Sequence, residues 1–149
     1  MIYFDTSALA KAYISEAGSD EVRELLSLNV DPICVSTLSL VEFRCAVARR
    51  TRARTLTELE GQRILSSFDD DIETGVFDVV AIDNADHISA RRLIDTVAPL
   101  PLKALDALHL AVVRRARETN ETAFVTSDAQ QAAAARALGI STQTVALKI

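Results

Sequence analysis

The chain opens with the stretch Ile2-Tyr3-Phe4-Asp5-Thr6-Ser7-Ala8-Leu9, in which an apolar run meets a carboxylate and two hydroxyls. Tyr3 and Phe4 favour a half-buried strand, and residues 7–13 have the composition of a helix. Asp5 therefore lies at the carboxyl end of a first strand, where open α/β sheets place their ligand sites. A buried aspartate is costly unless it is hydrogen-bonded, caps a helix or faces a cation. Asp5 or Thr6 is thus either the cap of the following helix or part of a functional site.

The composition predicts one compact, ordered domain over residues 1–149. The hydrophobic content of 49% is enough to bury a sizeable core. Charged residues make up 25%, and no linker, repeat or low-complexity run interrupts the chain. We therefore expect no second domain.

The charge balance is acidic, with a net charge of −5 and an isoelectric point near 5.0. This argues against broad, charge-driven coating of nucleic acid, so an enzyme of nucleic acids would have to gather its basic residues locally. No apolar run approaches the length of a membrane span, and residues 1–5 lack the pattern of a signal peptide. We expect a soluble cytoplasmic protein with no membrane partner.

The cysteines and histidines do not form a metal-binding pattern. Cys34 and Cys45 lack the close pairing and further ligands of a zinc site, and we expect both to be buried free thiols. His87 and His109 fall on separate predicted helices, so packing is their expected role.

A second strand and a helix are predicted over residues 33–36 and 39–47, after a connection that ends at Pro32. Glu42 falls in the first turn of this helix, where Ser39-x-x-Glu42 matches a capping box. Taken alone, the pattern favours a structural glutamate over a functional one.

The densest basic patch of the chain follows at once and consists of Arg44, Arg49, Arg50, Arg52 and Arg54. Such a run is usually a solvated helix face. It is also compatible with the footprint of a phosphate backbone, because a local patch attracts a polyanion even where the net charge opposes it.

The middle of the chain continues the alternation of helix and strand. Residues 55–74 are predicted to be mostly helical, with a capping box at Thr55-x-x-Glu58. A third strand follows over residues 76–82, and Asp83-Asn84 caps the next helix. That helix ends before Pro99-Leu100-Pro101, because proline is not tolerated in a helix interior.

Residues 105–113 form an almost wholly apolar helix that carries one carboxylate, Asp106, near its beginning. Helices that are apolar all round are buried, and a buried aspartate is costly. No capping box explains Asp106, although a later helix start would make it a cap. The pattern favours a functional role. His109 lies on the same helix face and is either a hydrogen-bond partner of Asp106 or, more simply, a packing residue.

Residues 123–128 repeat the arrangement at the start of the chain, with an apolar strand, two hydroxyls and an acid before a helical run. Asp128 is a good N-cap for this helix, and locally that interpretation is favoured. Gly139 ends the helix, and residues 140–147 alternate as a final strand does.

Strands that alternate with helices predict a three-layer α/β/α fold around a mainly parallel sheet. Two strands end in an acid and two helices carry one near their beginnings, so all four acids can meet at one edge of the sheet. Oxygen ligands without a histidine or cysteine set suit hard cations such as Mg²⁺ or Mn²⁺.

Four of these segments together resemble a known family, the PIN-domain ribonucleases, and specifically the VapC-type toxins of bacterial type II toxin–antitoxin systems. Residues 2–9 are similar to the opening strand of that family. The later motifs are similar to its glutamate helix, its most distinctive helix and its fourth acidic element: Leu40-Val41-Glu42-Phe43, Leu105-Asp106-Ala107-Leu108-His109-Leu110-Ala111 and Val125-Thr126-Ser127-Asp128. Each motif is weak alone, but four in order over nearly the whole length are specific.

The resemblance implies a PIN-like domain with an acidic site around Mg²⁺, or Mn²⁺ in its place. Its ligands would be Asp5, Glu42, Asp106 and Asp128. The implied activity is hydrolysis of RNA phosphodiester bonds by a metal-dependent endoribonuclease toxin. The neighbouring hydroxyls are further candidates for contacts to substrate or water: Thr6, Ser7, Thr126 and Ser127.

The resemblance also implies partners: an RNA substrate, a VapB-type antitoxin whose flexible tail blocks the acidic site, and a second copy of the chain in a homodimer. Two alternatives stay open. One is a non-catalytic interaction module with the same fold. The other is a phosphatase of the haloacid dehalogenase type, which is weakened because that chemistry needs an aspartate where this chain has Ser7.

Overall fold

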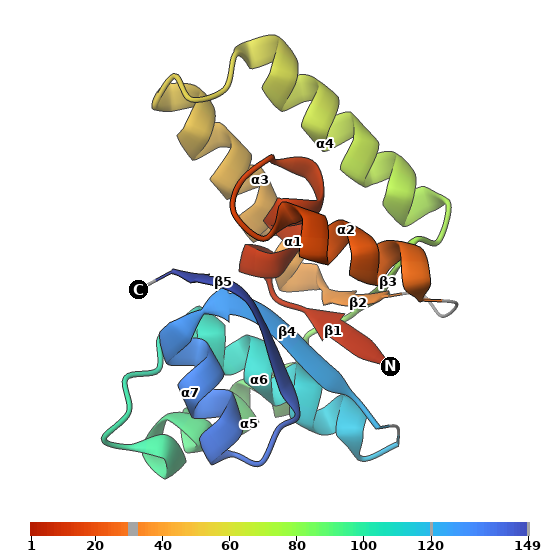
Figure 1. The fold of residues 1–149 in the computed structure, drawn as a ribbon. Helices are drawn as coiled ribbons and strands as arrows, with labels where there is room; N and C mark the ends of the chain where they lie inside the picture. The colour runs from red at the N-terminus through yellow and green to blue at the C-terminus, as the bar shows by residue number, and fades with distance from the viewer. Residues whose placement is uncertain (30–32, 120, 149) are drawn as a thin grey trace.

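The computed structural model describes residues 1–29, 33–119 and 121–148, so the predicted connection end at Pro32 lies outside the described residues. The strands are β1 (Ile2–Phe4), β2 (Ile33–Ser36), β3 (Phe77–Val80), β4 (Ala123–Asp128) and β5 (Thr142–Lys148) (Figure 1). The helices are α1 (Thr6–Tyr13), α2 (Ser19–Leu28), α3 (Thr37–Arg52), α4 (Glu58–Glu73), α5 (Asn84–Val97), α6 (Ala104–Arg117) and α7 (Ala129–Ala137).

The strands form one sheet in the order β3-β2-β1-β4-β5, and every described pairing is parallel. The central strand β1 places Tyr3 opposite Cys34 of β2 and opposite Phe124 of β4. Such a sheet needs helices on both faces, because its strands carry apolar side chains on both sides. The predicted parallel sheet is confirmed.

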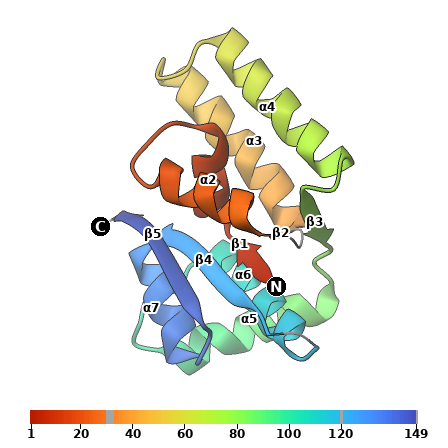
Figure 2. The same ribbon diagram turned by 45° about the vertical axis from the view of Figure 1, so that its right-hand side comes forward.

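Helices α1 to α4 lie on one face of the sheet and α5 to α7 on the other, which confirms the three-layer architecture (Figures 1 and 2). Right-handed crossovers account for this division. The chain moves outward from β1 to β3 and then returns past β1 to β4, and the helices change face when the direction reverses. Along β1, Tyr3 packs in one core and Phe4 in the other, because successive side chains of a strand point to opposite faces.

The direction of the sheet reverses between β1 and β4, and a crevice forms outside the carboxyl ends of strands at such a point. Asp5 directly follows β1, and Asp128 ends β4. The carboxyl end of β5 lies toward this edge of the sheet and the N-terminus at the opposite edge (Figure 1). The fold therefore brings both strand-end acids to the place where α/β sheets bind ligands.

One predicted capping box is wrong by two positions of the sequence. Helix α4 is capped by Thr57, whose hydroxyl accepts from the N–H of Glu60 at 3.2 Å, while the Glu60 carboxylate accepts from the N–H of Thr57 at 2.7 Å. The predicted box, Thr55-x-x-Glu58, has the same pattern. Local sequence cannot choose between two overlapping boxes, and here packing selects the later one.

The two cysteines lie in different environments. Cys34 is buried as expected, but Cys45 is exposed, so the prediction of a buried thiol is wrong there. In the described part of the chain, no helix combines the length and the apolar character that a membrane span requires.

Candidate active site

A cavity of about 500 Å³ lies at the carboxyl edge of the sheet, beside the point where the strand order reverses. All four predicted acids, from four separate segments, line it: Asp5, Glu42, Asp106 and Asp128. Thr6, Ser7 and His109 line it as well. The structure thus brings together residues that are up to 123 positions apart in the sequence.

Asp5 is both a helix cap and a member of this cavity. Its side chain is only 3% exposed and accepts from the N–H of Ala8 at 2.8 Å, which caps α1. The hydroxyl of Ser7 donates to the carboxylate at 2.8 Å, and that of Thr126 at 2.7 Å. Burial raises the pKa of Asp5, although the nearby His109 and these hydrogen bonds oppose the rise. Capping and function are therefore compatible at this residue.

The four candidate hydroxyls have different positions. Thr6 and Ser7 line the cavity, whereas Thr126 and Ser127 are completely buried and do not. The Thr126 hydroxyl donates a hydrogen bond to the Asp5 carboxylate, and the Ser127 hydroxyl has no hydrogen-bond partner among the described residues. Helices cover both faces of the sheet, so both side chains are buried although they point to opposite faces. Direct contact of Thr126 and Ser127 with substrate or water stays a prediction.

Glu42 lies in the second turn of α3 and not in a capping box. The helix begins at Thr37, and its box pairs Ser36 with Ser39. The Glu42 carboxylate instead accepts from the Thr6 hydroxyl at 2.5 Å, through Oε2. The predicted box of Ser39 with Glu42 is wrong because the N-cap of the helix, Ser36, lies three residues earlier than the predicted cap.

His109 is the second partner of Glu42, and this contact escaped prediction from the sequence. Its Nε2 lies 2.8 Å from Glu42 Oε2, and its Nδ1 lies 2.7 Å from the hydroxyl of Tyr3. An ionised carboxylate only accepts, so Nε2 carries a proton. In the neutral ring Nδ1 then accepts from Tyr3. Burial raises the pKa of Glu42, but the hydrogen bonds from His109 and Thr6 outweigh it and leave the pKa lowered.

The signal for His109 was present in the sequence but pointed to the wrong partner. A histidine on a buried helix face needs hydrogen-bond partners, and Asp106 is the acid nearest to it along that face. The ring is 2% exposed and bonds Glu42 and Tyr3 instead. His109 is therefore neither a hydrogen-bond partner of Asp106 nor only a packing residue.

Asp106 lies in the first turn of α6, where the sequence placed it. Among the described residues, no hydrogen bond or ion pair to its carboxylate is found. Burial raises its pKa to about 6, and the charges of Asp128 and Asp5 add to the rise against the opposing charges of Lys103 and His109. The electrostatic effects of two other acids on Asp106 show that the carboxylates of this cavity act on one another.

Asp128 caps α7, as its sequence context favoured. Its Oδ1 accepts from the N–H groups of Gln130 at 2.8 Å and Gln131 at 3.0 Å. Its Oδ2 lies 3.7 Å from the ammonium group of Lys103. Like Asp5, this acid is a cap whose carboxylate also lines the cavity.

The donor set suits a hard divalent cation. Carboxylate oxygens are the ligands that Mg²⁺ and Mn²⁺ prefer, and gathered carboxylates with raised pKa values are stabilised by a cation. Within the described ranges, however, no three Asp, Glu, His or Cys side chains are close enough together to form a ready-made ligand cluster. The chemistry of the cavity fits such an ion, while the coordination shell is not preformed.

Residues 2–137 match the model of the PIN domain family. The chain belongs to the PIN-domain family. It is 34% identical to ribonuclease VapC47 of Mycobacterium tuberculosis (strain CDC 1551 / Oshkosh) over 151 aligned positions, which cover 95% of both proteins. This similarity places the PIN domain among the VapC-type proteins, as the sequence motifs indicated, and decides against the haloacid dehalogenase alternative.

Solved structures share the PIN fold at lower sequence identity. The crystal structure of M. tuberculosis VapC20, described as a sarcin–ricin loop cleaving toxin, matches with a TM-score of 0.64 and 17% identity over 86% of each chain. A toxin–antitoxin complex from Klebsiella pneumoniae matches with a TM-score of 0.56 and 16% identity, over 85% of this chain and 86% of that one.

Proposed function

We propose that this VapC-type PIN protein is a Mg²⁺-dependent endoribonuclease that acts in the cytoplasm as the toxin of a VapBC-type pair. The observation that carries the proposal is the convergence of Asp5, Glu42, Asp106 and Asp128 from four segments on one cavity. The ribonuclease VapC47, similar over nearly its whole length, supports RNA as the substrate class.

Asp5 and Asp106 would be the main holders of the cation, with Glu42 and Asp128 beside them. When bound, Mg²⁺ supplies a nucleophile from water and stabilises charge on the phosphate. The chain's own residues prepare the site. Thr6 and His109 both contact Oε2 of Glu42, which leaves Oε1 available to another partner. Ser7 and Thr126 hold the carboxylate of Asp5.

The proposal is tested by incubating the pure protein with total RNA in Mg²⁺, in Mn²⁺ and in EDTA, and sequencing the fragment ends. We expect fragments with defined ends in the presence of metal and intact RNA in EDTA. A non-catalytic interaction module would leave the RNA intact in every condition and would so contradict the proposal.

Replacing Glu42 by Gln should separate its chemical role from its structural one. Glutamine keeps a carbonyl oxygen that can accept from both Thr6 and His109, because these donors share one oxygen in the native protein. We expect the midpoint of urea unfolding to change little while metal-dependent cleavage falls at least about tenfold. Unchanged cleavage would leave Glu42 a purely structural residue.

We further propose that a VapB-type antitoxin inhibits the toxin by placing an arginine among the carboxylates. A guanidinium group matches carboxylates bidentately and stays charged when it is desolvated. It would therefore relieve the repulsion that helps to raise the pKa of Asp106. The toxin–antitoxin complex that shares this fold supports a protein partner.

For the test, a small protein encoded beside this gene is co-expressed, and the arginines of its tail are replaced singly by alanine. At least one replacement should weaken inhibition, and added Mg²⁺ should compete with the tail. If neither the arginine replacements nor added Mg²⁺ weakens the inhibition, the cation-substitution mechanism is wrong. Sedimentation of the isolated toxin checks the homodimer, which stays a prediction.

A further inference from the structure

One face of α3 forms a wall of the active-site cavity over several turns. The residues on this wall include Glu42, Cys45, Ala46, Arg49 and Arg50, with the spacing of positions that share a helix face. At 1.5 Å per residue, Glu42 and Arg49 lie about 10 Å apart along the helix axis. The wall thus runs from a carboxylate, past two small side chains, to two guanidinium groups.

Arg50 is held at this wall by a partly buried ion-pair network. Its Nη2 donates to Glu16 Oε2 at 2.6 Å, and Glu16 Oε1 accepts from Lys11 Nζ at 3.1 Å. Lys11 is 1% exposed and also donates to the carbonyl of Ala17 at 2.6 Å. Burial alone would raise the pKa of Glu16, but Arg50 and Lys11 lower it to about 2. Glu16 therefore stays ionised and keeps Arg50 in place.

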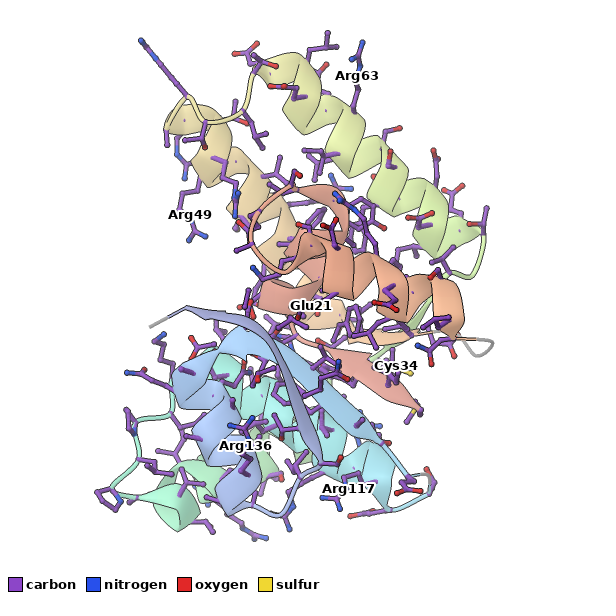
Figure 3. All side chains as sticks on the ribbon, viewed as in Figure 1. Glu21, Cys34, Arg49, Arg63, Arg117 and Arg136 are labelled. Carbon is purple, nitrogen blue, oxygen red and sulfur yellow. The ribbon has the colours of Figure 1, made fainter. Side chains whose placement is uncertain are left out.

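The other arginines of the basic patch have different positions. Arg44 donates to both carboxylate oxygens of Asp69 on α4, at 2.8 and 2.7 Å. Arg52 is exposed and does not line the cavity. Arg49 extends from α3 on the side away from α4, as Figure 3 shows, and lines the cavity without a hydrogen bond or ion pair to any described residue. Two of the five arginines of the basic patch, Arg49 and Arg50, thus line the cavity.

The ligand that fits this end of the cavity is a phosphate group. Guanidinium groups bind phosphate oxygens bidentately, and Arg50 uses only one of its nitrogens on Glu16. An RNA strand whose cleaved phosphate lies at the carboxylates extends along α3 and carries further phosphates. We propose that Arg49 and Arg50 bind such a second phosphate of the RNA strand, with Glu16 and Lys11 holding Arg50 in position. The proposal rests on the ribonuclease function proposed above.

The test measures binding of a short fluorescein-labelled oligouridylate by fluorescence anisotropy over a range of salt concentrations, in EDTA so that nothing is cleaved. Removing one phosphate contact on single-stranded RNA reduces the slope of log K against log salt by about 0.7. Arg49→Ala and Arg50→Ala should each show this reduction and bind about threefold to tenfold more weakly at low salt. Arg52→Ala is the matched control, because it removes the same charge from the same patch outside the cavity, and it should leave the slope unchanged.

Glu16→Gln tests the positioning of Arg50 separately. Removing a negative charge strengthens RNA binding if only total charge matters. The glutamine oxygen still accepts from Lys11, but Arg50 loses its ionic partner. If Glu16 positions Arg50, affinity should fall despite the gain in net positive charge. A rise in affinity would refute the positioning role.

The outcomes separate this inference from the ribonuclease proposal. If the wild type cleaves RNA while Arg49→Ala and Arg50→Ala bind with wild-type affinity and slope, the phosphate site is wrong and the ribonuclease stands. If the slopes fall as expected but no condition gives cleavage, the phosphate site stands and the hydrolysis proposal fails. A wild type that binds no oligouridylate overturns the phosphate site.

Discussion

Replacing Asp106 by Asn should abolish RNA cleavage and, in the metal-free protein, increase stability. Removing groups that merely support a metal ligand typically costs about 10–100-fold in activity or metal affinity. The loss of a proposed ligand should therefore exceed about 100-fold. Asparagine keeps the shape of the side chain but cannot neutralise a cation, so the fold should be unchanged.

The gain in stability follows from the pKa of Asp106, which burial and the neighbouring acids raise to about 6 from its ordinary 3.8. Between these pH values the folded protein binds a proton that the unfolded chain has released, so stability falls as pH rises through this window. Asparagine never ionises and avoids the loss. Because the side chain is partly exposed, solvent screening limits the gain to about 1 kcal/mol, or a Tm higher by about 2–4 °C.

Thermal unfolding in EDTA should show this difference at about pH 7.5 and largely lose it at about pH 3.5, below the ordinary pKa of 3.8, where Asp106 is protonated in the native protein and mostly protonated in the unfolded chain as well. Asp95→Asn is a suitable control, since Asp95 is exposed on α5 and does not line the cavity. It should change neither cleavage nor the pH dependence of Tm. An Asp106→Asn variant that is less stable at neutral pH, or that still cleaves, would contradict the role assigned to Asp106.

Asp5 should respond very differently to Asn and to Ala. Asparagine retains an oxygen that accepts from the N–H of Ala8, and its amide N–H can donate to the hydroxyls of Ser7 or Thr126. We therefore expect Asp5→Asn to fold normally and to lose more than about 100-fold in cleavage. Alanine removes every one of these contacts.

For Asp5→Ala we expect a further loss of about 2–3 kcal/mol in the free energy of unfolding, from the missing N-cap and from the hydrogen bonds that the hydroxyls of Ser7 and Thr126 make to the carboxylate. Urea unfolding and cleavage assays on the two variants separate the structural role of Asp5 from its chemical one. Equal stability of the two variants would show that the cap is dispensable, and cleavage by Asp5→Asn would remove Asp5 from the proposed ligands.

Two positions show how far local patterns reach in this chain. Asp128 and Asp83 each precede a helical run, and the sequence predicts both as N-caps. Both cap helices in the structure. A cap depends on the residue and the following turn, so a few neighbouring residues determine it. At Ser39 and Glu42 the same reasoning fails. Two overlapping boxes compete for one helix start, and the fold selects Ser36 with Ser39.

The sequence by itself determined the alternation of strands and helices, and with it the parallel three-layer sheet and the edge at which Asp5 and Asp128 emerge. These features follow from short-range periodicity and from the handedness of crossovers. The same pattern allowed all four acids to meet at that edge, and the resemblance of four motifs to the PIN family added their expected role in a ribonuclease site.

Only the tertiary structure decided which groups those acids contact. Glu42 is bonded to Thr6, 36 positions away, and to His109, 67 positions away. Likewise, the basic patch was visible in the sequence, but the choice of Arg49 and Arg50 depends on Glu16 and on the face that α3 turns to the cavity. The physical reason is that hydrogen bonds and ion pairs between distant segments depend on how whole helices pack against the sheet, which no local pattern encodes.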